Sequence, residues 1–359
     1  MNKLEEARIE IDEIDQKFVE LFERRMEIVT KVAQYKKENS MPIFDEKREN
    51  AVIEKNVKRL KNKELETEYV SFIRNLMDVS KLYQRKNIYG KQIAYQGVEG
   101  AFSHIAACNL FDGANFKNYA TFAGVMDAIL NDEVDCGVLP IENSTNGEVG
   151  EVMDGLFKRK DLFINAYYDL KVDQNLIALP GTRKEDIKKI YSHIQALEQS
   201  SNYLKSLDAE KISYPNTAMA AKLVKESGDK TMAAIGSLKT AEIYGLEVID
   251  ENINNSDLNT TRFAVVSKKR SSNGDKFGLL LVVNNSAGSL ATAINEISKT
   301  GLNMTCLRSR ALKDLAWEYY FYVEVTGDLN SKACQDMLDG LKKVCQSVRV
   351  LGSYQKLGD

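Results

Sequence analysis

The sequence contains little of what metal, redox and disulfide sites require. Only two of its 359 residues are histidine, His104 and His193, and two such distant histidines argue against a His-based metal site. The five cysteines are scattered and form no Cys-x-x-Cys pair, a usage typical of cytoplasmic proteins whose thiols stay reduced. We therefore expect a cytoplasmic protein that uses no metal and no cofactor.

Long apolar runs and a strong charge of one sign are missing as well. No apolar run approaches the roughly 18 residues of a membrane-spanning helix, and the chain is charged from Lys3 onward, unlike a secretory signal. The net charge of −3 offers no basic field to nucleic acid. Gly-x-Gly-x-x-Gly, the dinucleotide-binding fingerprint, is absent. We expect neither a membrane nor a nucleic acid as partner. The length predicts two or three domains at roughly 100–200 residues each.

Residues 1–88 carry a helical repeat of apolar side chains. Their alternating spacing of four and three residues predicts a long helix that packs along one seam. Pro42 ends this helix, and two further helices are predicted over residues 45–61 and 65–84. The seam positions of the first helix are Leu4, Ala7, Ile11, Ile14, Phe18, Leu21, Ile28 and Val32.

Polar side chains interrupt the inward faces of these helices. Arg25 occupies the seam position after Leu21, and an inward arginine is costly unless it meets an anion. Lys36 lies on nearly the same face, while Ser80 and Gln84 continue the apolar stripe of the third helix. Two interpretations stay open: a salt bridge between helices, or a cationic pocket for an anionic ligand.

This segment resembles the AroQ-type, all-helical chorismate mutase that is fused to bacterial prephenate dehydratases. The resemblance implies that chorismate rearranges to prephenate by a pericyclic shift, which needs orientation and electrostatic preorganisation and no nucleophile. It implies that Arg8 and Arg25 hold the two carboxylates, for which the planar guanidinium is suited. Lys36 and Gln84 would be catalytic donors to the ether oxygen. The implied chorismate-binding residues are Arg8, Arg25, Lys36, Asp45, Arg48, Glu49, Ser80 and Gln84, with Glu49 and Arg48 at the ring hydroxyl.

Helix geometry adds a requirement for a second chain. Arg8 and Lys36 stand 28 residues apart on one predicted helix, roughly 42 Å at about 1.5 Å per residue. Chorismate is far shorter, so Arg8 must come from another chain if both residues touch one substrate. A helix-swapped homodimer, as in the family, or a higher homo-oligomer meets this requirement.

Residues 91–269 alternate short apolar strands with helices, which predicts two α/β lobes. A return strand near Val265 is expected to rejoin the first lobe and leave a cleft between the lobes. A strand over residues 135–139 is predicted to stop at Pro140 and to pass into a polar loop. We also expect Ser103 to cap a helix and residues 183–190 to be helical.

Four stretches of this segment resemble the prephenate dehydratase family, in order along the chain. They are Gly97–His104, Pro140–Gly147, the stretch from Ser192 to Gln199, and Asn259–Phe263. Each alone has a plain structural explanation, such as a loop histidine or a surface ion pair. Together they imply a two-lobed, periplasmic-binding-protein-like fold that converts prephenate to phenylpyruvate.

The chemistry of that reaction indicates which groups are needed. Prephenate loses its ring hydroxyl and CO2, which requires a donor to the leaving hydroxyl and groups that hold two carboxylates. The resemblance makes Thr261 the catalytic residue, as the donor itself or as the group that positions a water or the hydroxyl. Arg262 or helix N-termini would anchor the carboxylates. The implied prephenate-binding residues are Glu142, Asn143, Ser192, Gln199, Thr217, Thr261 and Arg262.

Residues 276–359 follow a linker at 271–275 and show the order β-α-β-β-α-β, the ferredoxin-like split βαβ. This order resembles an ACT domain and implies allosteric inhibition by L-phenylalanine. Arg308 and Ala311 depart from the family motif Glu-Ser-Arg-Pro at its two ends, which indicates a weakened effector site. The implied effector-binding residues are Gly288, Ser289, Leu290, Arg308, Ser309 and Arg310.

The preferred hypothesis is a multidomain, bifunctional enzyme of phenylalanine biosynthesis with modules at 1–88, 91–269 and 276–359. These are all-α, two-lobed α/β and α+β respectively. A non-catalytic ligand sensor would not explain the mutase residues. A prephenate dehydrogenase fusion needs the missing nicotinamide fingerprint. A helical regulator with an ACT sensor needs a DNA-binding motif, which is not evident.

Overall fold

The computed structural model describes residues 2–39, 41–85, 90–271, 273–312 and 318–357. The chain divides between Gln92 and Ile93 into two compact units. We expect a short linker at 86–91 from the sequence as well. Most of this linker, and Ser272 of the expected linker at 271–275, lie outside the described residues.

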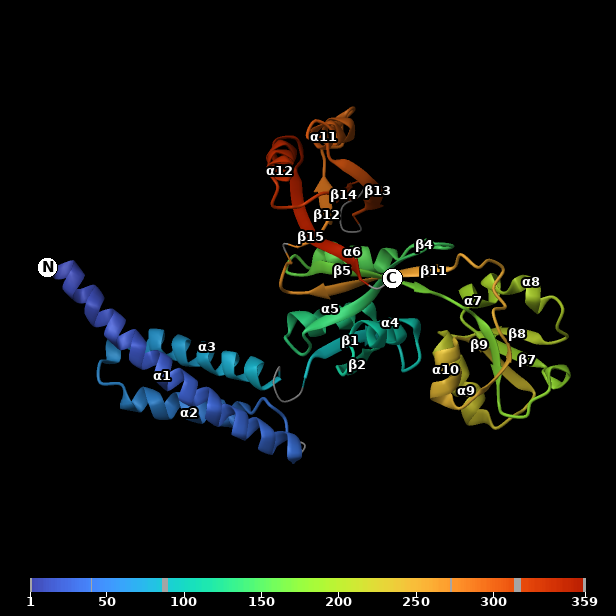
Figure 1. Cartoon of the computed structure of the whole chain (residues 1–359), viewed down its shortest axis with the longest axis horizontal. Coiled ribbons are helices and arrows are strands. Elements are labelled where there is room, and N and C mark those ends of the chain that lie inside the picture. The colour runs from blue at the N-terminus through green and yellow to red at the C-terminus, as the bar shows by residue number, and fades with distance from the viewer. Residues whose placement is uncertain (1, 40, 86–89, 272, 313–317, 358–359) are drawn as a thin grey trace. The chain divides into compact units, whose positions relative to one another are not determined.

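Three helices form the first unit, as predicted (Figure 1). They are α1 (Lys3–Glu38), α2 (Glu46–Arg59) and α3 (Glu66–Gln84), with a short 3-10 turn at Lys63–Leu65. A capping box starts α1: Asn2 accepts from the Glu5 amide at 2.9 Å and its own amide donates to the Glu5 carboxylate at 3.0 Å. Asp45 caps α2 by accepting from the Arg48 amide at 2.9 Å.

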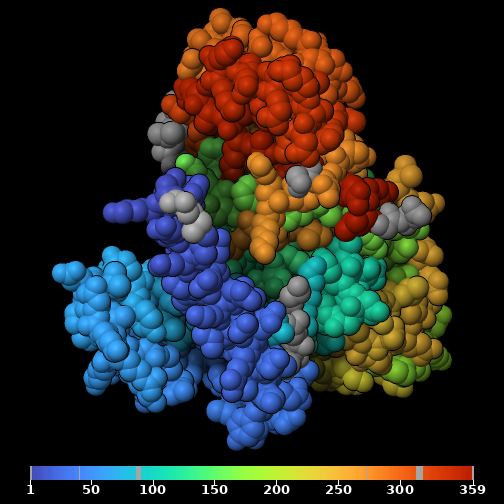
Figure 2. Space-filling view, turned by 60° about the vertical axis from the view of Figure 1, so that its left-hand side comes forward, coloured from blue at the N-terminus to red at the C-terminus, as the bar shows by residue number. Residues whose placement is uncertain are grey.

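The apolar seam of α1 is open to solvent in a single chain. Ile11, Phe18 and Leu21 are each more than half exposed, at 55%, 52% and 63%. Figure 2 shows the dark blue side chains of α1 at the surface. An apolar helix face of this length normally packs against another surface. The predicted seam is therefore not buried among the residues that the structure describes, and α1 buries Met26 and Ala33 instead.

The first lobe of the second unit is a mixed sheet flanked by three helices (Figure 1). The sheet order within it is β5-β11-β3-β1-β2, with β4 paired to β3. β1 and β3 are parallel, whereas β11 runs antiparallel to both β3 and β5. The predicted return strand near Val265 is β11, and it rejoins this lobe. The elements are β1 (Gln92–Gln96), α4 (Phe102–Leu110), β2 (Asn115–Tyr119), α5 (Phe122–Leu130), β3 (Cys136–Asn143), β4 (Gly147–Glu148), α6 (Gly150–Lys158), β5 (Phe163–Lys171) and β11 (Thr260–Ser267).

Strand β3 runs on through Pro140 to Asn143, so the prediction that it stops at Pro140 is wrong. Proline lacks the N–H that a ladder requires. The pairing of β11 with β3 shifts register between Arg262 and Phe263, and Phe263 is the partner of Pro140. A bulge at this point accommodates the proline. Glu142 and Asn143 are therefore neighbouring strand residues, whose side chains point to opposite faces of the sheet.

The start of α4 also differs from the prediction. The cap position is Ala101, without a side-chain hydrogen bond, and Ser103 is a buried residue inside the helix. The Gly100 N–H donates instead to His104 Nδ1 at 3.1 Å. His104 therefore satisfies a donor that precedes the helix, and no side chain caps α4.

The second lobe has a five-stranded sheet in the order β10-β6-β9-β7-β8. Residues 183–190 are not a helix: they form a 3-10 turn at Lys184–Asp186 and the start of β7. Pairing of β7 with both β8 and β9 provides ladder hydrogen bonds that outweigh local helix propensity. The elements are β6 (Asn175–Ala178), β7 (Lys189–Ser192), α7 (Ile194–Gln199), α8 (Ser201–Leu204), β8 (Glu210–Ser213), α9 (Thr217–Ser227), β9 (Met232–Gly236), α10 (Leu238–Tyr244) and β10 (Glu247–Asp250).

The C-terminal module, residues 276–357, has the predicted β-α-β-β-α-β order. Its strands lie in the order β13-β14-β12-β15. β15 continues beyond the module and pairs in parallel with β5 of the first lobe, from Gln355 opposite Ala166 to Leu357 opposite Tyr168. The two sheets are therefore one continuous sheet. The elements are β12 (Lys276–Val282), α11 (Ser289–Ser298), β13 (Asn303–Ala311), β14 (Tyr319–Thr326), α12 (Lys332–Val344) and β15 (Ser347–Leu357).

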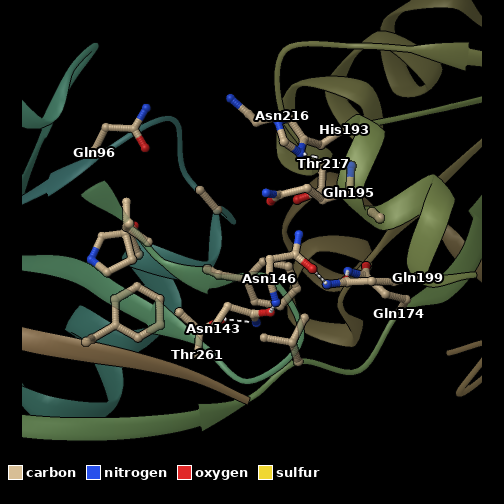
Figure 3. A pocket seen from close by; sticks show the side chains of 18 of the residues that line it. Gln96, Asn143, Asn146, Gln174, His193, Gln195, Gln199, Asn216, Thr217 and Thr261 are labelled. Atoms are coloured by element: carbon tan, nitrogen blue, oxygen red, sulfur yellow. Dashed lines mark hydrogen bonds between the residues drawn. The ribbon is translucent and has the colours of Figure 1, made fainter. Parts of the chain in front are cut away.

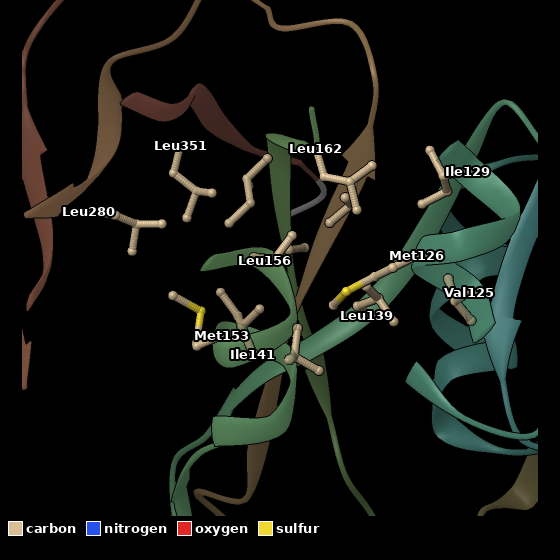
Figure 4. Close-up of a cluster of buried hydrophobic side chains, with 14 of the residues drawn as sticks. Val125, Met126, Ile129, Leu139, Ile141, Met153, Leu156, Leu162, Leu280 and Leu351 are labelled. Atoms are coloured by element: carbon tan, nitrogen blue, oxygen red, sulfur yellow. The ribbon is translucent and has the colours of Figure 1, made fainter. Parts of the chain in front are cut away.

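One apolar core serves both the first lobe and the C-terminal module. Leu280 and Leu351 of the module lie beside Met153 and Leu156 of α6 (Figure 4). Buried tyrosine hydroxyls cross the same junction, with Tyr167 Oη 2.9 Å from Tyr322 Oη and Tyr322 Oη 3.1 Å from Tyr354 Oη. Shared apolar area and a satisfied buried polar chain make this junction part of the fold. Of the helices that the structure describes, none combines the length and the apolar character needed to cross a bilayer.

Candidate active sites

A cavity of about 470 Å³ lies between the two lobes of the second unit (Figure 3). Three phenylalanine rings, Phe102, Phe122 and Phe263, line it together with many uncharged polar side chains. No lysine or arginine stands among its described lining residues. The polar side chains that line it are Gln96, Ser103, Asn143, Asn146, Gln174, His193, Gln195, Gln199, Asn216, Thr217 and Thr261, with Glu148.

Asn143 organises the floor of this cavity. Its Oδ1 accepts from the backbone N–H groups of Thr145 and Asn146, both at 3.0 Å. Because those two donors fix the oxygen, the amide nitrogen must point the other way. It donates to Asn259 Oδ1 at 2.9 Å and to Thr261 Oγ1 at 3.0 Å. Asn143 thus ties the turn after β3 to strand β11.

The hydroxyl of Thr261 is left as a donor by this arrangement. Its oxygen accepts the Asn143 amide proton, and its own proton has no acceptor among the side chains and backbone that the structure describes. Thr261 lines the cavity beside Phe263, two residues further along β11. Side chains at this spacing share one face of a strand. The geometry therefore presents a hydroxyl O–H to whatever fills the cavity.

Arg262 lies on the opposite face and does not line the cavity. Its guanidinium donates to both oxygens of Asp169, at 2.7 and 3.0 Å, and stands over the Tyr167 ring. This carboxylate raises the pKa of Arg262, and the guanidinium lowers the pKa of Asp169. The sequence offered Arg262 or helix N-termini as carboxylate anchors, and only helix N-termini reach the cavity. The first residues of α4 and α9, Phe102 and Thr217, line it.

The other residues expected at this site divide into two groups. Gln199 and Thr217 line the cavity with Asn143 and Thr261, and Gln199 accepts from Asn259 Nδ2 at 3.0 Å. Ser192 is fully buried behind the cavity and donates to the Ile235 carbonyl at 3.0 Å. Glu142, on the far face of β3, forms an ion pair with Arg308 of the C-terminal module.

Sequence reasoning missed several lining residues, of which His193 is chemically the richest. Its Nδ1 accepts from the Gln195 N–H at 3.3 Å and caps α7. An accepting Nδ1 places the proton of the neutral ring on Nε2. Burial lowers the pKa of His193, which favours that neutral form. His193 lies in the stretch from Ser192 to Gln199 that resembles the family, whereas Gln174 lies in no such stretch.

In the first unit, the structure brings Arg25 and Ser80 together. The Arg25 guanidinium donates to Ser80 Oγ, which in turn donates to the Leu76 carbonyl at 2.6 Å. Burial lowers the pKa of Arg25. Lys36 donates to the Ile43 carbonyl at 2.6 Å. Gln84 is buried, and its Oε1 has no partner among the described groups.

Four other residues expected in the mutase pocket lie elsewhere in the single chain. Arg8 and Arg48 are exposed, and Asp45 is occupied as the cap of α2. Glu49 pairs at 2.9 Å with Lys81. Sequence reasoning missed Lys81, although it directly follows Ser80. A groove of about 770 Å³ borders Arg25, walled by apolar residues of α1 and α3.

The residues expected to bind an effector fall on two faces of the C-terminal module. Gly288, with φ of 83°, opens α11, and Ser289 Oγ lies 2.7 Å from Ser286 Oγ. Along β13 the side chains alternate: Ser309 is exposed, whereas Arg308 and Arg310 turn toward the first lobe. Leu290 is half-buried. Among the described residues no cluster of histidine, cysteine, aspartate or glutamate is arranged to hold a metal ion.

Comparisons with known proteins match both units. The family model of Prephenate dehydratase matches residues 93–271, and that of Chorismate mutase type II matches residues 7–85. Among solved structures, a prephenate dehydratase from Arthrobacter aurescens in complex with L-Phe has a TM-score of 0.69 at 25% identity, over 74% of this chain and 90% of that chain. A structure described as a novel type of quorum quenching acylase has a TM-score of 0.68 at 29% identity, over 74% and 97%.

A curated relative covers both units at once. The bifunctional chorismate mutase/prephenate dehydratase of Buchnera aphidicola subsp. Acyrthosiphon pisum is 33% identical over 98% of this chain and 96% of its own length. The acylase shows that the fold of the second unit also carries other chemistry, so fold alone does not assign the reaction. Both family models match this chain, and the Buchnera relative carries both activities in its name and matches over nearly the full length of both chains. The chain belongs to the bifunctional chorismate mutase/prephenate dehydratase family.

Proposed function

We propose that the chain rearranges chorismate to prephenate in its helical unit and converts prephenate to phenylpyruvate in the interlobe cavity. The observation that carries the proposal is the Asn143–Thr261 pair at the cavity floor, in a chain whose other unit holds Arg25 against Ser80. The modules at 1–88 and 91–269 would each carry one reaction. The residue roles follow from the contacts of each site.

In the mutase site, Arg25 and Ser80 would receive one carboxylate of chorismate. Their mutual hydrogen bond holds the guanidinium in place before the substrate arrives. Lys36 and Gln84 would donate to the ether oxygen, where negative charge develops as the C–O bond breaks. Gln84 is buried on α3, one turn from Ser80. No proton transfer or cofactor is required by this rearrangement.

The second carboxylate would be held by Arg8 of another copy of the chain. α1 is one uninterrupted helix from Lys3 to Glu38, so Arg8 and Lys36 of the same chain cannot meet one small substrate. The exposed apolar seam of α1 and the apolar groove beside Arg25 support a dimer in which α1 packs against its counterpart. Glu49, Arg48 and Asp45 would then lie at the rim of the shared site.

In the dehydratase cavity, Thr261 would donate a hydrogen bond to the leaving ring hydroxyl. The ring carboxylate leaves as CO2, the electrons of its C–C bond enter the ring, and the hydroxyl leaves as hydroxide, which takes a proton from solvent and becomes water. Asn143 supports this role by occupying the acceptor side of Thr261. A threonine hydroxyl is a weak acid. The aromatic stabilisation of the product ring therefore supplies the driving force, and the hydrogen bond from Thr261 lowers the barrier.

Substrate carboxylates would be held without arginine. The N-terminal turns of α4 and α9 reach the cavity, and helix N-termini combine free N–H groups with a favourable dipole. Gln199 and His193 supply further donors, and the three phenylalanine rings form an apolar wall for the ring of prephenate. Ser192 and Arg262 would not contact the substrate. Their hydrogen bonds would hold strands β7 and β11 in place behind the cavity.

We assign the C-terminal module, residues 276–359, as an ACT domain that senses L-phenylalanine. Its strand order and the two helices support the assignment. The match to the L-Phe complex covers 74% of this chain, much more than residues 93–271 alone provide. The effector site would use Gly288, Ser289 and Leu290 at the start of α11, with Ser309 on the exposed face of β13.

The proposal is tested by incubating the purified full chain with chorismate and without cofactor. Loss of chorismate absorbance and appearance of phenylpyruvate are expected. Prephenate added directly should give phenylpyruvate as well. A chain that consumes chorismate but leaves added prephenate intact would contradict the dehydratase assignment. A chain that acts on prephenate only would contradict the mutase assignment.

A further inference from the structure

The two arginines of β13 turn toward the first lobe and pair with acidic residues of segments that border the dehydratase cavity. Arg308 forms an ion pair with Glu142. Arg310 donates to both oxygens of Asp154, at 2.7 and 3.0 Å, and to Glu148 at 3.2 Å. These contacts join one strand of the module to three acidic residues of the first lobe.

The segment that receives them, residues 142–150, shapes the cavity. β4 pairs with β3 so that Glu142 stands opposite Glu148, and Asn143 opposite Gly147. Glu142 directly precedes Asn143, which holds Thr261. Glu148 lines the cavity itself. Each strand of this hairpin therefore pairs with one arginine. Glu142 is the direct neighbour of Asn143, which lines the cavity, and Glu148 lines the cavity itself.

Packing makes the contact with Arg310 specific. Its guanidinium lies against Gly150, where an added Cβ would overlap its nitrogen atoms. The side chains of Glu148 and Asp154 are 14% and 12% exposed, so solvent screens these pairs poorly. Tyr320 Oη also donates to Asp154 Oδ1, at 2.9 Å. Removing Arg310 would take an ion-pair partner from the largely buried Glu148 carboxylate.

We propose that Arg308 and Arg310 are positioning residues for the dehydratase reaction, and that the C-terminal module thereby holds in place the hairpin that lines the cavity. This inference rests on the proposed dehydratase function. It also explains the departure of Arg308 from the family motif: the residue serves the hairpin 142–150 and not the effector. A shift of β13 on effector binding would reach Asn143 through these ion pairs.

A double-mutant cycle tests the inference in the full chain. The variants are Arg308→Gln, Glu142→Gln and the double variant, with Lys342→Gln, a surface residue of α12 paired with Asp339, as matched control. Steady-state kinetics with prephenate give kcat and KM separately, chorismate consumption monitors the other unit, and thermal melting monitors folding. Arg310→Gln and Arg310→Lys extend the cycle to the second arginine.

Arg308→Gln is expected to lower dehydratase kcat roughly 10-fold or more, since a small displacement of a reacting group is costly. The melting temperature and chorismate consumption should stay at the control's level. The double variant should recover most of the loss, because it leaves no unpaired carboxylate. Arg310→Lys should retain more activity than Arg310→Gln.

The positioning role alone would be overturned by an unchanged kcat in Arg308→Gln and Arg310→Gln, or by strictly additive losses in the cycle. A loss that only follows a lowered melting temperature would also overturn it, in favour of a purely structural contact. Absence of phenylpyruvate formation by the wild-type chain would instead remove the dehydratase function itself, and the positioning role with it.

Discussion

Asn143 Nδ2 and Thr261 Oγ1 lie 3.0 Å apart, although 118 positions separate the residues in the sequence. The pairing of β3 with β11 places Thr261 directly opposite Asn143. Because Asn143 Oδ1 is held by two backbone N–H groups, the amide cannot turn to accept from the threonine. The direction of this one hydrogen bond decides that the threonine proton points into the cavity.

Thr261→Val is expected to reduce dehydratase kcat by about 10²–10³-fold, the scale of one lost preorganised donor. The change keeps the shape and the strand propensity of the residue and removes the hydroxyl. Thr261→Ser, which restores the donor, should retain most of the activity. Chorismate consumption should not change. Equal activity of the valine variant and the wild type in prephenate kinetics would contradict the donor role.

Arg25→Ala should lower mutase turnover by about 10²-fold or more, because it removes a carboxylate anchor and leaves Ser80 without its partner. Arg24→Ala is the matched control, since Arg24 is the exposed neighbour on the same helix. Dehydratase activity on added prephenate should survive both changes. A loss of both activities in a folded Arg25→Ala chain would refute the model of two separate sites.

Subunit complementation tests the shared mutase site. Arg8→Ala and Lys36→Ala chains should each lose mutase activity on their own. After unfolding and joint refolding, half of the dimers are mixed, and each mixed dimer has one site free of both changes. About a quarter of wild-type activity should therefore return, as expected for a two-fold symmetric dimer. No recovery in mixed samples would show that each site is built within one chain.

The pH dependence of stability should include a contribution from His193. Burial lowers the pKa of this group below its ordinary value of 6.5, so the unfolded chain binds more protons than the folded chain between the two values. The resulting stability is fully present above about pH 6.5 and is lost as the pH falls through the folded pKa. Protonation of Nδ1 would also remove the cap of α7.

His193→Asn tests this expectation, because asparagine caps helices well and does not titrate. The melting temperature of the second unit should fall less steeply between pH 6.5 and 5 in the variant than in the wild type. His104, whose pKa burial also lowers, contributes in the same direction and stays in both chains. Identical slopes for the two chains would refute the contribution of His193.

The substitution Arg308→Glu tests whether Arg308 acts on the effector or on the hairpin 142–150. The change restores the acid of the family motif, and an effector role would predict tighter inhibition by phenylalanine. The ion pair with Glu142 predicts the opposite: two carboxylates would face each other, and uninhibited dehydratase activity should fall roughly 10-fold or more. Dehydratase rates measured with and without phenylalanine distinguish these outcomes.

Local patterns predicted the helical unit best. The periodicity of the first 84 residues depends only on neighbours along one helix, and α1, α2 and α3 appear within a few residues of the expected bounds. The failures at Pro140 and at residues 183–190 have a common cause, since both segments run into strands stabilised by distant partners. A bulge or a ladder formed with a remote strand leaves no mark on the local sequence.

The face of a strand decides which of the expected site residues line the candidate cavity. Motif resemblance points to segments, and it does not tell which side chain of each segment reaches the cavity. Thr261 and Arg262 are neighbours, yet one lines the cavity and the other pairs with Asp169 behind it. The same alternation separates Asn143 from Glu142 and Ser309 from Arg308. Gln174 was missed because it belongs to no motif and reaches the cavity through the fold alone.

The continuous sheet sets a limit on how this protein can be taken apart. A chain cut near residue 271 would lose β15, and β5 would then expose a row of unpaired N–H and C=O groups, the kind of edge that promotes aggregation. Side chains such as Leu156 would lose their apolar cover as well. The C-terminal module therefore cannot be removed without disturbing the first lobe. In an evolutionary exchange of modules the dehydratase lobes and the C-terminal module would be inherited together, since they form one compact unit, whereas the helical residues belong to the other unit.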